Sequence, residues 1–127
     1  MKIIEIHNIL SKEEVLQRYE GYLFDPDYIV DEEHVIFAYI HMKKAFEKKR
    51  NIAKDPRIEF LLRLSGETQI SKAMEIGVKD NMKRLGILIP EEEGISEIKG
   101  KMEKIKSFFG TTDKKEIFEK IAVMEIL

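Results

Sequence analysis

The chain of 127 residues contains no cysteine and no tryptophan, and it has only three prolines. Without cysteine, disulfide bonds, thiolate metal sites and cysteine nucleophiles are all excluded. No apolar run reaches the roughly 18 residues that cross a bilayer, and Glu5 and His7 stand where a secretory signal would be apolar. We therefore expect an intracellular protein that works in the cytoplasm.

Composition favours one well-packed domain with a strongly ionised surface. Hydrophobic residues make up 43% of the chain and charged residues 36%. A chain of this length buries a sizeable core without help from disulfides or metals. There is no internal repeat, low-complexity tract or linker, so we predict a single domain over residues 1–127.

Hydrophobic periodicity predicts both helices and strands. The predicted helices cover residues 12–20, 32–49, 56–64, 68–76 and 95–109 and a last stretch that begins at 113. The predicted strands cover residues 2–8, 85–90 and 122–127. The chain therefore combines helices with strands, and the first strand should lie near the centre of a sheet.

The net charge of −2 conceals an uneven distribution of charge along the chain. Residues 1–42 hold 3 basic and 9 acidic side chains, whereas residues 43–84 hold 12 and 6, and residues 85–127 hold 7 and 9. A local cluster of lysine and arginine is what gives a protein affinity for nucleic acid. The middle third therefore either forms a phosphate-binding face or is spread over a solvated surface.

The sequence contains no convincing catalytic motif. Gly94 and Gly100 resemble a phosphate loop, but five residues separate them where four are needed, and Met102 replaces the serine or threonine. His34 and His41 lie on one predicted helix at an axial separation of roughly 10 Å, which is too far to chelate one ion. No serine stands in a nucleophile elbow. The residues favour a binding or scaffolding protein over an enzyme.

Two other functional classes remain open. A small enzyme that uses a divalent metal is the main alternative, because four carboxylates cluster in a short acidic stretch. These residues are Asp25, Asp27, Asp31 and Glu33. The third interpretation is a structural adaptor that associates with itself.

The residues Ser65 and Gly66 separate two predicted helices. Gly66 supplies the left-handed conformation that ends the first helix, and Ser65 or Thr68 supplies a cap for the second. The start of the second helix then presents unpaired amides, which attract phosphate. Arg63 precedes this turn, although Glu59 stands four residues earlier and is able to hold it in a surface pair.

The segment of residues 61–80, LLRLSGETQISKAMEIGVKD, resembles the signature of a known family, the small kinase-binding subunit of the KEOPS (EKC) complex, here of archaeal type. The resemblance extends to HVIFAYIHMKKAF and to EKIAVMEIL, and the stretch between Pro90 and Asp113 is shorter than the family pattern. The residues that carry the motif are Arg63, Ser65, Gly66, Gln69, Ile70, Ala73 and Gly77.

The resemblance implies an α+β fold, with helices packed around a small mixed or antiparallel β-sheet, and no catalytic activity or cofactor. It also implies a regulatory role in the formation of threonylcarbamoyladenosine in tRNA. The protein would bind the atypical small kinase of the complex, help to recruit tRNA through its CCA end, and meet the other KEOPS subunits indirectly.

Candidate contacts follow from the resemblance and from the basic middle third. Gln69 is able to bond a base edge or ribose in a single-stranded end, and the other tRNA candidates would meet phosphates. The tRNA candidates are Lys43, Lys44, Lys48, Lys49, Arg50, Arg57, Arg63, Gln69, Lys72 and Lys79. The kinase candidates are Ile117, Phe118, Ile121, Met124 and Ile126. The alternative interpretation is that these residues belong to the core.

Overall fold

The computed structural model describes the backbone of residues 1–126 and the side chains of residues 1–125. The prediction of an α+β fold is confirmed. The α-helices, 3₁₀-helices (η) and strands are, in chain order, β1 (Lys2–Ile9), α1 (Lys12–Arg18), β2 (Tyr22–Phe24), η1 (Pro26–Tyr28), α2 (Glu32–Glu47), α3 (Pro56–Ser65), α4 (Ile70–Ala73), η2 (Met74–Ile76), β3 (Met82–Ile89), β4 (Gly94–Ile95), α5 (Met102–Phe109), α6 (Lys114–Val123) and η3 (Met124–Ile126).

The four strands form one mixed sheet in the order β2-β3-β1-β4. β3 pairs antiparallel with both β1 and β2, and its register with β1 places Ile3 opposite Leu88. The short strand β4 pairs parallel with β1 and lies in the stretch after Pro90. The sequence predicted β1 and β3 but missed β2 and β4. Strands of only two or three residues are too short to show an alternation of apolar and polar side chains.

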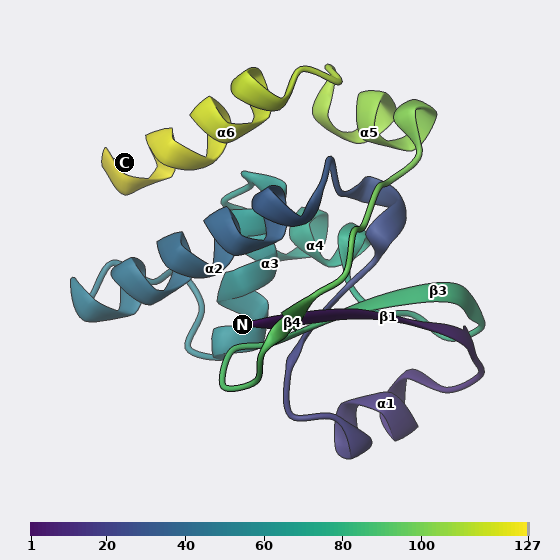
Figure 1. Ribbon diagram of the computed structural model, residues 1–127. Helices are drawn as coiled ribbons and strands as arrows, with labels where there is room; N and C mark the ends of the chain where they lie inside the picture. The colour runs from purple at the N-terminus through teal and green to yellow at the C-terminus, as the bar shows by residue number, and fades with distance from the viewer. Residues whose placement is uncertain (127) are drawn as a thin grey trace.

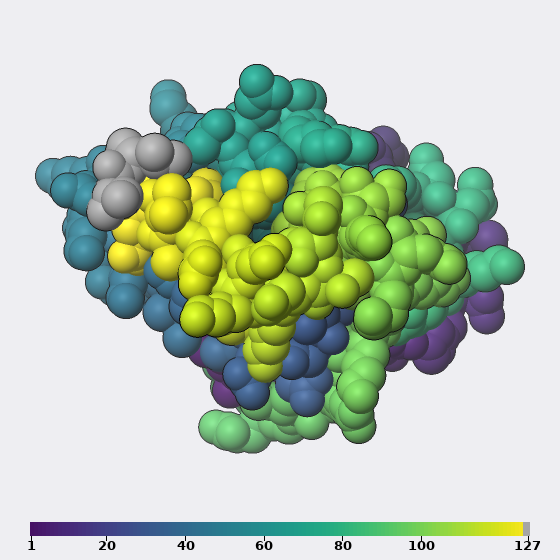
Figure 2. Space-filling view, turned by 90° about the horizontal axis from the view of Figure 1, so that it is seen from above, coloured from purple at the N-terminus to yellow at the C-terminus, as the bar shows by residue number. Residues whose placement is uncertain are grey.

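The molecule has layers on both faces of this sheet (Figure 1). Helices α2, α3 and α4 cover one face, and α1 lies on the opposite face. Helices α5 and α6 form a further layer over α2, and they occupy the centre of the surface seen from above in Figure 2. None of the helices in the described residues combines the length and apolarity needed to span a membrane.

Three apolar clusters correspond to these layers. The largest lies between the sheet and helices α2 and α3, where Phe24 and Phe60 are completely buried. A second cluster under α1 includes Val15 and Leu85. The third, between α2 and the outer helices, is built on buried residues of α5 and α6 such as Ile105 and packs against aromatic side chains. The outer layer therefore has its own small core.

Local sequence signals set the boundaries of α1, α2 and α3. Ser11 accepts a hydrogen bond from the amide of Glu14 at the start of α1, and Asp31 accepts one from His34 at the start of α2. Asp55 caps α3, and its side chain accepts a hydrogen bond from the amide of Arg57. These caps agree with the predicted helix starts.

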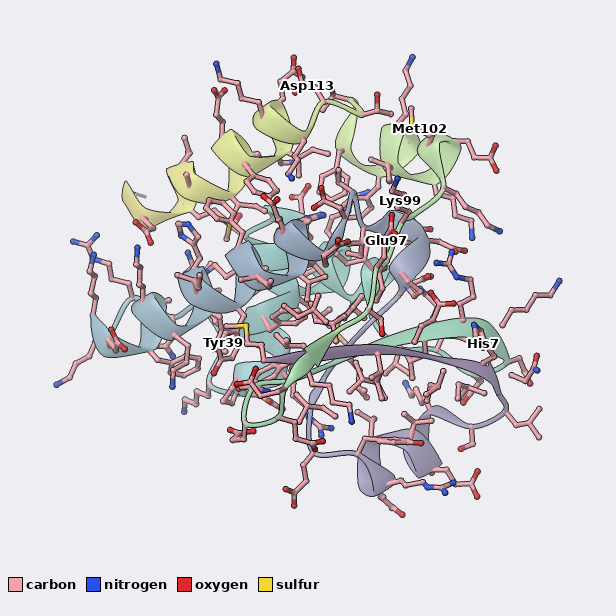
Figure 3. The ribbon with its side chains drawn as sticks, viewed as in Figure 1. His7, Tyr39, Glu97, Lys99, Met102 and Asp113 are labelled. Atoms are coloured by element: carbon pink, nitrogen blue, oxygen red, sulfur yellow. The ribbon has the colours of Figure 1, made fainter. Side chains whose placement is uncertain are left out.

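Two predictions for the second half of the chain were wrong. Residues 122–127 do not add a strand in the described part, because α6 continues to Val123 and passes into η3. The helix predicted from residue 95 begins only at Met102, since the preceding segment is extended and pairs with η1. The amide of Gly100 donates to the carbonyl of Ile29 at 2.7 Å, and that of Lys101 to the carbonyl of Asp27 at 2.8 Å. Figure 3 labels Glu97 and Lys99 in this segment.

Candidate binding surfaces

The turn at Ser65 and Gly66 has the geometry that the sequence predicted for a helix end. Gly66 has φ 68° and ψ 22°, and the amide of Glu67 donates to the carbonyl of Leu62 at 3.2 Å. Ser65 is buried, and its hydroxyl donates to the Leu62 carbonyl at 3.0 Å. The cap predicted for the second helix was wrong, because α4 starts after Gln69 without a side-chain cap and is only four residues long.

Arg63 lies inside the protein, so the prediction that it contacts tRNA directly does not fit its position. Its side chain is 2% exposed, and its Nε donates to Oε2 of Glu59 at 2.8 Å. The other oxygen of Glu59 accepts the amides of Ile52 and Ala53, both at 2.7 Å. This buried pair fixes the loop between α2 and α3 and explains a polar arginine in the motif without an external ligand.

The other cations near the turn are also held by internal partners. Lys72 lies 3.2 Å from a carboxylate oxygen of Glu75, and Lys79 lies 3.7 Å from one of Asp25. The guanidinium of Arg57 donates to two backbone carbonyls at the end of α1. The turn is therefore a structural corner with little cationic charge to spare for a phosphate.

The C-terminal end of α2 has the opposite character. Two lysines of its last turns, and the two lysines and the arginine that follow the helix, are exposed. Among the residues that the structure describes, no carboxylate lies within 4.0 Å of any of the four lysines. Arg50 donates to the backbone carbonyl of Glu125 at 2.6 Å. We call this surface the α2 basic end, and it consists of Lys43, Lys44, Lys48, Lys49 and Arg50.

Two motif residues beside the corner face the solvent. Gln69 is exposed, and the side chain of Ile70 is 43% exposed. Gly77 is buried instead, since a Cβ there would lie 2.9 Å from Cδ1 of Leu61. The motif therefore combines packing positions with a small exposed face of one amide and one apolar side chain.

Most of the predicted kinase contacts are core residues. Ile117, Ile121 and Met124 are all buried, and the ring of Phe118 stacks on Phe37 with centroids 4.4 Å apart. The side chain of Ile126 lies outside the described residues. Burial keeps Ile117, Ile121 and Met124 from reaching a partner, because removing them from the core would open cavities in the outer layer.

The solvent-facing side of α6 carries other residues. Val123 is 49% exposed, and Ala122 beside it is also exposed. An apolar contact with a partner through the last helix would use this side.

The four clustered carboxylates do not form a metal site. Asp25 caps η1, and burial raises its pKa. Asp31 and Glu33 both contact Nζ of Lys114, at 2.7 and 3.1 Å. In the described part of the chain no three histidine or carboxylate side chains are placed to share an ion. The interpretation of the chain as a metal-dependent enzyme loses its support, because lysines and arginines already pair with the carboxylate oxygens of these four residues.

Asp27, the remaining member of that cluster, pairs with cations of β3, of α5 and of the loop before α5. Burial opposes its ionisation, but the hydrogen bond from Lys104 and the charges of Lys101 and Arg84 outweigh burial and lower its pKa. Its carboxylate is therefore ionised at neutral pH.

A comparison with protein families gives a match over residues 4–124, to the family described as kinase binding protein CGI-121. The chain belongs to this family. The match covers nearly the whole chain and both parts of the corner. A comparison with curated proteins gave no match.

Membership in the CGI-121 family confirms the resemblance to the kinase-binding subunit of KEOPS. A kinase-binding family also fits the interpretation of the chain as a binding protein. The tRNA contacts at the α2 basic end remain predictions.

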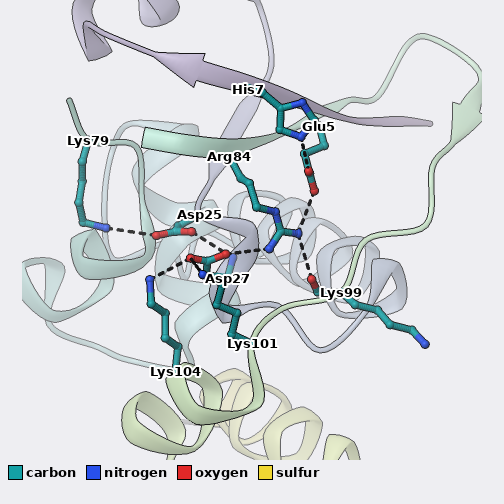
Figure 4. A network of polar contacts seen from close by, with 9 residues as sticks. All are labelled: Glu5, His7, Asp25, Asp27, Lys79, Arg84, Lys99, Lys101 and Lys104. Atoms are coloured by element: carbon teal, nitrogen blue, oxygen red, sulfur yellow. Dashed lines mark hydrogen bonds and ion pairs between the residues drawn. The ribbon is translucent and has the colours of Figure 1, made fainter. Parts of the chain in front are cut away.

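Sequence reasoning missed one cluster of charged side chains altogether. Around Asp27 and Asp25, cations from β3, α5 and the loops before each of them converge (Figure 4). Lys83 and Arg84, two adjacent cations near the start of a strand whose other residues are uncharged, were the available signal.

Proposed function

We propose that this protein is the non-catalytic, cytoplasmic subunit of a complex that forms threonylcarbamoyladenosine in tRNA. It binds and regulates the small atypical kinase of that complex and helps to recruit tRNA by its CCA end. The observation that carries this proposal is the match of residues 4–124 to a kinase-binding family.

The exposed side of α6 is our candidate for the kinase contact. Its apolar residue Val123 is half exposed, whereas Ile121 two residues earlier is buried in the outer layer. A charge at Val123 would disturb a partner but not the fold, since it remains in water in the free protein. A charge at Ile121 would have to enter the core.

Capture of the small kinase that co-purifies with this chain tests the contact. Val123→Glu should weaken capture at least about tenfold without changing the melting temperature. Ser107→Glu adds the same charge at an exposed position of α5 and should leave capture unchanged. Ile121→Glu should unfold the protein. Wild-type capture by Val123→Glu, or failure of any kinase to co-purify, would contradict the proposal.

The α2 basic end and the exposed residue Gln69 support the role in tRNA recruitment. Lysines without carboxylate partners gain the most from binding phosphates, since no internal ion pair has to be broken. An exposed amide next to an apolar side chain suits an unstacked terminal base.

Binding of tRNA with and without its 3′ CCA tests this half of the proposal. Removal of the CCA should weaken binding about tenfold or more, whereas a tRNA with an altered anticodon loop should bind as before. Equal affinity for the intact and shortened tRNA would argue against recognition of the CCA end.

A further inference from the structure

A recess of about 390 Å³ lies where η1, β3 and α5 meet, and the function proposed above does not use it. Its inner wall carries the carboxylates of Asp25 and Asp27. Four cationic residues belong to the lining and Lys79 lies beside it; Figure 4 draws all of them except Lys83. The four lining cations are Lys83, Arg84, Lys101 and Lys104.

Asp27 holds three of these cations in position. It accepts hydrogen bonds from Nη1 of Arg84 at 2.7 Å and from Nζ of Lys104 at 2.8 Å, and Nζ of Lys101 lies 3.8 Å away. Arg84 is fixed further by Oε1 of Glu5 at 2.9 Å and by the carbonyl of Lys99 at 3.0 Å. The cationic groups are therefore arranged before any ligand arrives, which lowers the cost of binding.

Positive charge remains in excess after these pairs are made. The five cations face three carboxylates, those of Glu5, Asp25 and Asp27, which leaves a net charge of +2. Lys83 has no carboxylate within 4.0 Å among the described residues, and Lys104 has three donors of which one is used. The bond to Asp27 raises the pKa of Lys104, so it is charged at neutral pH.

An anion entering the recess meets ammonium groups before it meets the carboxylates. The side chains of Asp25 and Asp27 are 11% and 13% exposed, whereas those of Lys101 and Lys104 are 52% and 42% exposed. The N-terminus of α5 opens at the same place, and Lys101 at its N-cap position offers no side-chain acceptor for the helix amides. Several donors therefore converge on a space outside the carboxylates.

We propose that this recess binds a phosphate group. A phosphate combines more than one negative charge with several acceptor oxygens, which matches an excess of cations with donors left over. The group could belong to a small phosphorylated molecule or to the backbone of a nucleic acid. The site is independent of the α2 basic end, which the proposed RNA contacts use.

Titration calorimetry with inorganic pyrophosphate at constant ionic strength tests the site. The double variant Lys83→Ala with Lys101→Ala should lose about tenfold or more in affinity, because two exposed donors are removed. The double variant Lys54→Ala with Lys115→Ala removes the same charge at exposed positions away from the recess and should change affinity less than about twofold. Equal losses in both variants, or no binding by the wild type, would overturn the proposal.

Amide chemical shifts of the wild type give a readout that does not depend on any variant. Pyrophosphate should shift the amides of residues 101–104 more than those of residues 43–50. Shifts confined to the α2 basic end would overturn the proposal.

A single-stranded oligonucleotide, titrated at the same phosphate concentration, separates the two sources of the group. Loss of pyrophosphate binding alone in the recess variant assigns the site to small phosphorylated molecules. Loss of binding to both pyrophosphate and the oligonucleotide assigns the site to the nucleic-acid backbone. Loss of neither overturns the proposal. A Lys43→Ala, Lys48→Ala variant should keep pyrophosphate binding even if the proposed RNA role fails.

Discussion

Arg63 on α3 and the lysines at the end of α2 carry the same charge in opposite surroundings. The guanidinium of Arg63 is buried against Glu59, whose second oxygen accepts two amides of the adjoining loop. The lysines of the α2 basic end lie in water with no carboxylate nearby in the described structure. A buried, paired cation stabilises the fold, whereas an exposed, unpaired one is available to a partner.

Breaking the buried pair gives the largest effect that we predict on stability. Glu59→Ala leaves the buried Arg63 charge without a carboxylate and the amides of Ile52 and Ala53 without their acceptor. We expect a loss of about 3–5 kcal/mol in the free energy of unfolding, measured by urea denaturation. A loss below about 1 kcal/mol would mean that Arg63 reaches solvent, as the exposed lysines of the α2 basic end do.

The buried histidine at the start of α2 gives the next largest effect. The ring of His34 accepts the amide of Val30 at Nδ1, at 3.2 Å, and donates from Nε2 to the carbonyl of Leu64, at 2.9 Å. The bond at Nδ1 requires a neutral ring, because a protonated Nδ1 is unable to accept a hydrogen bond. Burial accordingly lowers the pKa of His34 from 6.5 to about 4.

The direction of the pH dependence follows from this shift. Between pH 6.5 and about 4 the unfolded chain binds a proton that the folded chain does not, so stability falls as the pH falls. The loss attributable to His34 is on the order of 3 kcal/mol, and it is absent above pH 6.5. His41 adds to the same trend. Burial lowers its pKa, although the negative charge of Glu125 acts in the opposite direction.

Urea denaturation between pH 4 and pH 7 checks this prediction. The variant His34→Gln should show a shallower dependence on pH than the wild type, whatever its absolute stability. His7→Gln changes an exposed histidine and serves as the control. Equal slopes in the wild type and His34→Gln would show that the ring is not held neutral.

The glycine at the corner gives a smaller effect. Gly66→Ala places a side chain at φ 68°, which should cost about 1 kcal/mol. Gly110 ends α5 at φ 79° with open space around it, so Gly110→Ala measures the backbone cost alone. At Gly66 the new Cβ would also lie 3.0 Å from Cγ of Lys120.

Thermal unfolding of the two alanine variants sharpens the comparison. The loss for Gly66→Ala should equal or slightly exceed that for Gly110→Ala, because the lysine side chain is flexible and moves aside. A clearly smaller loss at Gly66 would contradict the assignment of the corner as a left-handed helix end.

Much of the fold was predictable because its signals are local. Ser11, Asp31 and Asp55 cap the helices that they were expected to start, and Gly66 ends α3. The C-terminal residues were misread as a strand, because an apolar run of that length also suits a buried helix segment. Only the contacts of this C-terminal segment with α2, which lies far away in the sequence, decide between a strand and a helix.

The candidate site was less predictable than the fold. The spacing of Glu59 and Arg63 indicates a helix-surface pair, and nothing local shows that the loop at Ile52 and Ala53 folds over it. The recess around Asp27 was missed for the same reason, since its cations come from segments up to 77 residues away. Burial depends on the whole fold and not on the spacing of residues.

The lysines at the end of α2 should have the smallest effect on stability and a clear effect on RNA binding. Lys43→Ala with Lys48→Ala should change the free energy of unfolding by less than about 0.5 kcal/mol, because both side chains are exposed.

The most direct test of the contrast between Arg63 and the α2 basic end is the salt dependence of tRNA binding by this double variant. If both lysines contact phosphates of a single-stranded end, the slope of log affinity against log salt should become shallower by about 1.4. An unchanged slope, with the protein still folded, would contradict the assignment of RNA contacts to the α2 basic end.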